Sequence, residues 1–126
     1  MEVQSLERTF IDKVFAICDY RLQGLHDRVS RHLYDIAKLL PEIDLNSELT
    51  DLVKIVREDR MQSKNNPSAQ PEYDIPSMLG EIINSGYYKA DYVNVTQKLL
   101  YEEMPYEKAI DDGIAVIASS DVFAYK

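Results

Sequence analysis

A broad apolar stripe along the first predicted helix limits the folds that this chain can adopt. Between residues 6 and 22, apolar side chains recur at steps of three and four residues, the spacing of one helical face: Leu6, Phe10, Val14, Ile17, Cys18 and Leu22. Ile11 and Phe15 widen this stripe to roughly half of the helix circumference, more than a helix at a protein surface needs. Gly24 follows as a natural stop, because glycine tolerates the left-handed conformation that often ends a helix. We therefore expect a long helix at the centre of the fold.

Helical patterns continue through most of the remaining chain. Further helices are predicted over residues 30–40, with Ser30 as N-cap, and over 46–61, 76–84, 92–101 and 105–117. Residues 62–74 hold two prolines and almost no apolar side chains, so a long polar loop is expected there. Strand patterns are scarce, and no segment repeats. The sequence therefore predicts an all-α bundle of five to six helices, forming a single domain over residues 1–126.

The charge of the chain restricts its partners. The 22 Asp and Glu outnumber the 14 Lys and Arg, which gives a net charge of -8. Binding nucleic acid by bulk electrostatics needs clustered positive charge, so nucleic acid is not an expected partner of this chain alone. Contacts with phosphate are expected in the first half, because residues 1–66 hold 10 of the 14 basic side chains. A lone cysteine, Cys18, and the lack of a signal peptide or membrane-length apolar run predict a cytoplasmic protein without membrane contact.

Three charged side chains are candidates for a binding site. Lys13 lies at the edge of the apolar stripe, where a lysine buries its stem and presents its ammonium at the rim of a cleft. Arg31 and Asp35 lie one turn apart on the second predicted helix. In the functional interpretation Arg31 meets a phosphate, which its planar fork suits, and Asp35 fixes Lys13 or a ligand. In the structural interpretation Lys13 is an ordinary surface lysine, and Arg31 and Asp35 form a solvated ion pair.

Five further charged residues are candidates for docking or phosphate contact. Glu7 and Arg21 point along the apolar stripe, so they either pair with other helices or face a surface that another domain covers. Arg57, Arg60 and Lys64 form a basic stripe that leads into the polar loop. This stripe is either a solvated face or a contact with nucleic-acid phosphate or an acidic partner.

The sequence offers little for catalysis or metal binding. His26 and His32 are six residues apart with no cysteine or carboxylate at a ligand spacing, so a zinc site is not expected. Two Glu-x-Asp triplets, residues 42–44 and 72–74, lie in predicted loops with no phosphate-binding glycine nearby. A two-metal nucleotidyltransferase needs such a pair held rigidly, so we interpret both triplets as surface charge.

Several segments together resemble the AbiEii/AbiGii nucleotidyltransferase toxin family. Leu-Glu-Arg-Thr-Phe-Ile-Asp-Lys-Val-Phe-Ala at residues 6–16 resembles its E-R-T-F-x-x-K-x-x-A segment. Ser-Arg-His-Leu-Tyr-Asp-Ile at residues 30–36 resembles its S-R-H-x-Y-D-[IL] segment at a similar separation. Residues 56–60, 67–70 and 98–102 are similar to the downstream part of the family. The likeness spans about residues 6–112, most of the chain.

The resemblance implies a role in nucleotide binding. Members are bacterial toxins of abortive-infection or toxin–antitoxin systems, with an N-terminal nucleotidyltransferase domain that carries the metal-binding carboxylates and a helical domain after it. In this family the helical domain contributes a lysine and an aspartate to the nucleotide side of the cleft, which match Lys13 and Asp35, with Glu7 and Arg31 as neighbours. The implied ligand is a nucleoside triphosphate with magnesium, once a catalytic domain is joined.

This chain therefore resembles the helical C-terminal half of such a toxin. It has no catalytic carboxylates, so we expect it to be inactive alone and to bind no cofactor alone. The implied partner is an N-terminal nucleotidyltransferase domain or a separate protein, for which an antitoxin is one candidate. The alternative is a non-catalytic interaction module, an orphan domain that docks on a partner or forms a homodimer through the face of Glu7 and Arg21.

Overall fold

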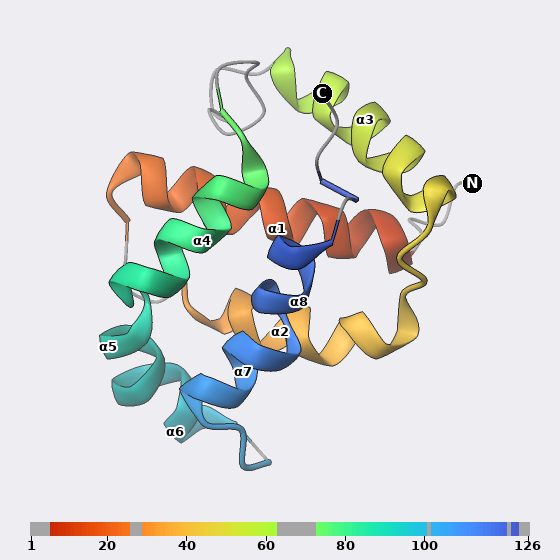
Figure 1. Cartoon of the computed structure of the whole chain (residues 1–126). Coiled ribbons are helices and arrows are strands. Elements are labelled where there is room, and N and C mark those ends of the chain that lie inside the picture. The colour runs from red at the N-terminus through yellow and green to blue at the C-terminus, as the bar shows by residue number, and fades with distance from the viewer. Residues whose placement is uncertain (1–5, 26–28, 63–72, 101, 121, 124–126) are drawn as a thin grey trace, which may run out of the picture.

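The computed structural model describes residues 6–25, 29–62, 73–100, 102–120 and 122–123 (Figure 1). Within these ranges every regular element is helical, which confirms the predicted all-α fold. The elements are α1 (Leu6–Gln23), α2 (Arg31–Leu39), the 3-10 turn η1 (Leu40–Glu42), α3 (Ser47–Met61), α4 (Ile75–Ser85), α5 (Lys89–Asp91), the π-helical turn η3 (Tyr92–Thr96), α6 (Gln97–Leu99), α7 (Tyr106–Asp112) and α8 (Ile114–Ser119). Residues 89–99 form one continuous helix. With α7 and α8 taken as two halves of another, the described chain is a six-helix bundle, as predicted.

The first helix lies at the centre of the bundle, as its wide apolar stripe predicts. Figure 1 shows α1 crossing the middle of the molecule, and it packs against α2, α3 and α4. Its buried side chains are Phe10, Ile11, Val14, Phe15, Ile17, Cys18 and Asp19. Leu6 and Leu22, the two ends of the predicted stripe, are exposed, because the helix ends reach beyond the packed layer. The burial of Asp19 is not foreseen by the apolar pattern and matters for the site.

Several helix ends follow local sequence signals. α1 ends before Gly24, which takes the left-handed conformation at φ 75°. Asn46 caps α3 by accepting a hydrogen bond from the backbone N–H of Leu49 at 3.0 Å. Asp74 caps α4 in the same way, and Gly86 ends that helix at φ 62°. These caps supply partners for backbone groups that a helix end leaves unpaired.

Two local predictions are wrong. Ser30 precedes α2 as expected, but its side chain makes no cap; it has helical dihedral angles and bonds instead to Asp91. The last helix does not run unbroken from residue 105 to 117, since it is interrupted at Gly113 between α7 and α8. A Cβ on Gly113 would lie 2.8 Å from the carbonyl oxygen of Ala109 and 3.3 Å from the backbone nitrogen of Ala37. Glycine at this position avoids the close contact with Ala109 and eases the tight one with Ala37 of α2.

The C-terminal helices complete the core. α8 packs on α4 and α7, and α7 packs on α2. Tyr88 and Tyr92 are fully buried, and their hydroxyls donate to the carbonyl oxygens of Ile17 and Met104. No helix in the described part of the chain is long and apolar enough to cross a membrane. Most of the predicted polar loop, residues 63–72, lies outside the described residues.

Candidate functional site

The structure brings Lys13 and Asp35 together across α1 and α2. Lys13 Nζ lies 3.2 Å from Asp35 Oδ2, and the two side chains are 25% and 26% exposed. The pair therefore sits at the rim of the α1–α2 contact, half shielded from water. An ammonium has three donors, so Lys13 can keep this bond and still offer protons to a ligand at the same rim.

Arg31 extends this pair into a chain of three charges. Its Nε lies 3.9 Å from Asp35 Oδ1, one turn away on α2, and its side chain is 63% exposed. One carboxylate thus stands between two cations, so the group carries a net positive charge. The long, exposed contact to Arg31 contributes little to stability, and it leaves the guanidinium fork positioned at the surface. The three residues form what we call the Lys13–Asp35–Arg31 chain.

A cavity of about 350 Å³ opens beside Lys13. Its lining consists of Thr9, Asp12, Lys13, Ala16, His32 and Arg60. His32 comes from the first turn of α2, and its ring lies 5.6 Å from that of Tyr20, centroid to centroid. Burial lowers the pKa of His32, and the positive charge of Lys13 lowers it further against the opposing effect of Asp35. The imidazole beside Lys13 is therefore neutral at neutral pH.

The spacing of His26 and His32 bears only on metal binding and does not predict the place of His32 in this cavity. Its Nδ1 is buried and has no hydrogen-bond partner among the described residues. The signal was available, since His32 follows Arg31 directly and precedes Asp35 by three residues, one helical turn. Within the described part of the chain, no three His, Cys, Asp or Glu side chains group as metal ligands.

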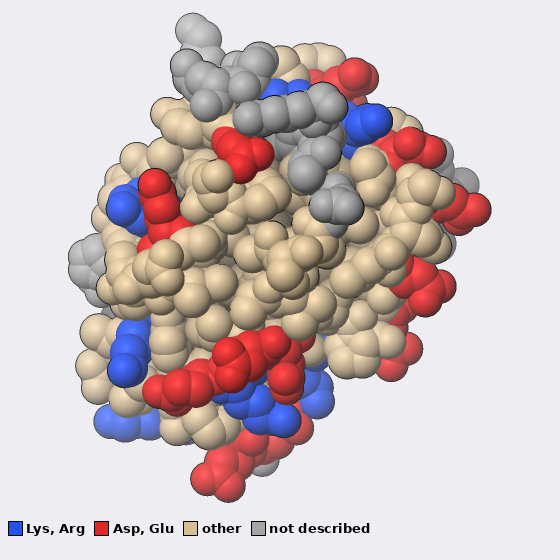
Figure 2. Space-filling view, viewed as in Figure 1, with Lys and Arg blue, Asp and Glu red and all other residues tan. Residues whose placement is uncertain are grey.

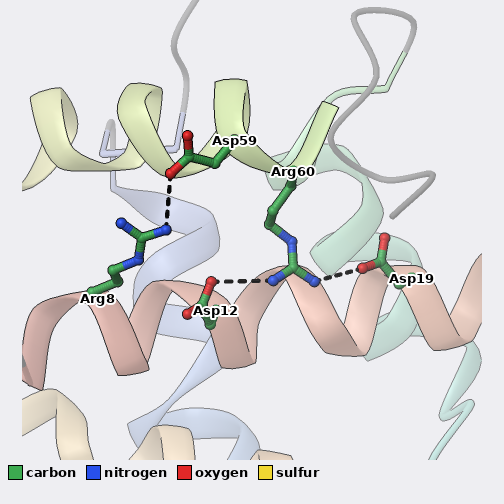
Figure 3. Close-up of polar contacts among 5 residues, drawn as sticks. All are labelled: Arg8, Asp12, Asp19, Asp59 and Arg60. Atoms are coloured by element: carbon green, nitrogen blue, oxygen red, sulfur yellow. Dashed lines mark hydrogen bonds and ion pairs between the residues drawn. The ribbon is translucent and has the colours of Figure 1, made fainter. Parts of the chain in front are cut away.

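Arg60 faces α1 from α3 (Figure 3). Its guanidinium pairs with Asp12 Oδ1 at 3.1 Å and with Asp19 Oδ2 at 2.8 Å, and it lies over the ring of Phe15. The Arg60 side chain is 18% exposed and that of Asp19 is 5% exposed. Arg60 therefore reaches the cavity wall but spends much of its hydrogen-bonding capacity on two carboxylates of α1.

Of the other two members of the predicted basic stripe, the structure describes one. Arg57 is half-buried on α3, and Lys64 lies outside the described residues. Arg8 of α1 forms a second, outer bridge to Asp59 of α3 at 2.9 Å (Figure 3). The α1–α3 boundary is thus joined by two ion-pair groups, one partly buried and one exposed.

Glu7 and Arg21 lie near opposite ends of α1. They are fourteen residues apart on α1, which corresponds to about 21 Å along a helix axis. Glu7 lines a separate cavity of about 370 Å³ with Asp44, Asn46, Glu48, Leu49 and Leu52. At the other end, the Arg21 guanidinium lies over the ring of Tyr87, 4.8 Å from its centroid. The two predicted docking residues therefore have different local surroundings at the two ends of one helix, and a shared docking face stays a prediction.

The face of the molecule drawn in Figure 2 shows no large cluster of Lys and Arg side chains among the described residues. Its middle is uncharged, and acidic and basic side chains mix in a band below, where Figure 1 places α7. That helix exposes Glu107, Lys108, Asp111 and Asp112. Such mixed charge does not attract nucleic acid by bulk electrostatics.

The fold and this group of charges define an all-α domain with a half-buried lysine–carboxylate pair between its first two helices. Residues 1–116 match the model of a family described as nucleotidyl transferase AbiEii toxin, type IV toxin–antitoxin system. The chain belongs to this family, which confirms the resemblance that its motifs indicate. No curated protein and no solved structure matches the chain.

Proposed function

We propose that this chain is the helical part of a nucleotidyltransferase-like toxin and binds the phosphates of a nucleoside triphosphate. The observation that carries the proposal is the Lys13–Asp35–Arg31 chain at the rim of the α1–α2 contact, beside a cavity. Lys13 would donate to phosphate oxygens with the protons that Asp35 does not take. The exposed Arg31 fork would bind a second pair of oxygens, a geometry that suits guanidinium and phosphate.

Asp35 is a positioning residue in this proposal. Its carboxylate holds Lys13 in place before the ligand arrives, which reduces the entropy lost when two long side chains are ordered on binding. We place the metal-binding carboxylates on a separate nucleotidyltransferase domain or chain, with this domain supplying the phosphate contacts. Magnesium that accompanies the triphosphate would neutralise charge on the phosphoryl group that is transferred. An antitoxin is the functional counterpart that the family implies, and the cytoplasm is the compartment in which we place the pair.

The test measures binding of inorganic triphosphate, which carries the phosphates without any base. Its dissociation constant would be determined by NMR titration of the 126-residue chain, with and without magnesium. Lys13→Ala is expected to raise the constant about tenfold or more, because a hydrogen bond to a charged group contributes roughly 1.5–3 kcal/mol. The free energy of unfolding should fall by only about 1 kcal/mol, since the pair is partly solvated.

Lys54→Ala is the matched control, because Lys54 is an exposed lysine on α3, away from this rim. It should leave the dissociation constant unchanged. If Lys13→Ala and Lys54→Ala bind inorganic triphosphate equally well while both remain folded, the proposal is overturned.

A further inference from the structure

A third cavity opens beside Arg31. It measures about 380 Å³ and is lined by Arg31, Val95, Thr96 and Leu99. Leu99 is 68% exposed and Val95 is 37% exposed, so the cavity presents aliphatic side chains to a ligand with one guanidinium at its edge. Apolar walls with a few polar groups are typical of small-ligand sites, and this volume lies within their usual range.

A buried polar network holds the walls of this cavity in place. Asp91 Oδ2 accepts from the backbone N–H of Ser30 at 3.2 Å and from its hydroxyl at 2.5 Å. The hydroxyl oxygens of Ser30 and Thr96 lie 2.8 Å apart. Because Ser30 gives its only hydroxyl proton to the carboxylate, Thr96 must be the donor to Ser30. Ser30, Asp91 and Thr96 are all buried, so this network is shielded from competing water.

The network fixes two chain segments relative to one another. Ser30 is followed directly by Arg31, and Thr96 ends the π-helical turn η3. A π-helical turn widens the helix locally and is frequent at functional sites. Thr96 of the cavity wall is thereby held by contacts within the fold, and the network also fixes Ser30, the residue next to Arg31.

Arg31 is shared between this cavity and the Lys13–Asp35–Arg31 chain. Successive residues of a helix point about 100° apart, so Arg31 and His32 direct their side chains to different sides of the first turn of α2. His32 lines the cavity beside Lys13, and Arg31 lines the third cavity. A ligand whose phosphates lie on Lys13 and Arg31 would therefore have an apolar cavity next to its phosphates.

We propose that the cavity of Arg31, Val95, Thr96 and Leu99 binds the nucleobase of a phosphate-bearing nucleotide. A base has two flat faces that pack against aliphatic side chains, and a guanidinium can stack on such a face. The adjoining positive charge suits the phosphate attached to the same nucleotide. This inference rests on the proposed function, and it adds a binding site for the base to the proposed binding site for the phosphates. The nucleotide is either the free triphosphate or the terminal unit of a polynucleotide strand.

The experiment compares ATP, GTP, CTP and UTP with inorganic triphosphate on the whole chain, by NMR titration with methyl labels. At least one nucleotide should bind about tenfold more tightly than inorganic triphosphate and should shift the methyl signals of Val95 and Leu99. Leu99→Ala should weaken that nucleotide about fivefold, as expected for loss of apolar contact, and should leave inorganic triphosphate unaffected. Ile55→Ala removes another large exposed side chain, 53% exposed on α3, and should change neither constant.

A trinucleotide with a free 3′ hydroxyl provides the second arm. If Leu99→Ala weakens a nucleoside triphosphate, the cavity takes the base of the free nucleotide; if it weakens only the trinucleotide, the cavity takes the strand terminus. Equal binding of every nucleotide and of inorganic triphosphate, with no shift at Val95 or Leu99, overturns the base site. If Lys13→Ala does not weaken the binding of inorganic triphosphate, the proposed function is overturned instead. The two failures are therefore distinguishable.

Discussion

Replacement of Arg60 by glutamine is expected to destabilise the fold far more than the same replacement of Arg8. Both arginines bridge α1 and α3, so both changes remove one positive charge from the same boundary (Figure 3). They differ in burial. The side chains of the Arg60–Asp19 pair are 18% and 5% exposed, whereas those of the Arg8–Asp59 pair are 38% and 54% exposed.

The expected loss follows from that difference. Removing one partner of a buried ion pair costs about 3–5 kcal/mol, because the remaining charge loses its compensation in a medium of low polarity. Arg60 is not fully buried, and its second partner, Asp12, is 32% exposed. We therefore expect Arg60→Gln to lower the free energy of unfolding by about 3 kcal/mol, the lower end of that range. For Arg8→Gln the expected loss is about 0.5 kcal/mol, the usual value for an exposed pair. For a chain of this length these losses correspond to falls in Tm of roughly 11 °C and 2 °C.

Urea denaturation followed by circular dichroism gives both free energies of unfolding. Asp19→Asn and the double variant with Arg60→Gln complete a double-mutant cycle that isolates the pair. A difference of less than about 1 kcal/mol between Arg60→Gln and Arg8→Gln would refute the reasoning, because burial would then not decide the strength of these bridges. A large difference would assign Arg60 mainly to the α1–α3 contact.

Two further predictions concern backbone approach and pH. Gly113→Ala should lower the free energy of unfolding by about 2–3 kcal/mol in urea denaturation, because its Cβ would meet the Ala109 carbonyl at 2.8 Å. Gly80→Ala, with nothing within 4 Å of its Cβ, should raise that free energy by about 0.5–1 kcal/mol through helix propensity. Equal effects of the two variants would refute this prediction. Burial and Lys13 hold the pKa of His32 below 6.5, so the unfolded chain binds the proton more readily and stability is lost as pH falls below that value. His32→Gln should remove this loss, and a wild-type minus variant difference that is flat from pH 7.5 to 5.5 in the same assay would contradict it.

Much of the fold follows from local patterns. The long stripe of α1 and the stop at Gly24 act within a few residues, so the sequence alone predicts them. The break at Gly113 could not be predicted this way, because the apolar spacing continues across it and a glycine costs a helix only about 1 kcal/mol. At the break Gly113 has φ -120° and ψ -103°, and the lack of a Cβ there avoids close contacts with Ala109 and with Ala37 of the distant α2.

The geometry of the candidate site depends even more on contacts between residues that are far apart in the sequence. Ser30 carries a good local signal for an N-cap, but Asp91, 61 residues later, takes its hydroxyl proton, so tertiary pairing overrides the cap. The helical wheel puts Lys13 at the edge of the stripe, and the sequence leaves Asp35 to fix either Lys13 or a ligand. The packing of α1 on α2 brings Asp35 to Lys13. For the same reason the basic stripe on α3 could not reveal that Arg60 turns towards two carboxylates of α1.

The two charged groups of α1 are linked through the helix itself. Asp12 and Asp19 are seven residues apart, two helical turns, so they share the face that Arg60 holds against α3. Lys13 follows Asp12 by one residue, and its side chain therefore points about 100° away around the axis, towards α2. Any rotation of α1 that broke the Arg60 bridges would also carry Lys13 Nζ away from Asp35. The orientation of the proposed phosphate-binding lysine is thus set, in part, from an adjoining face of its own helix.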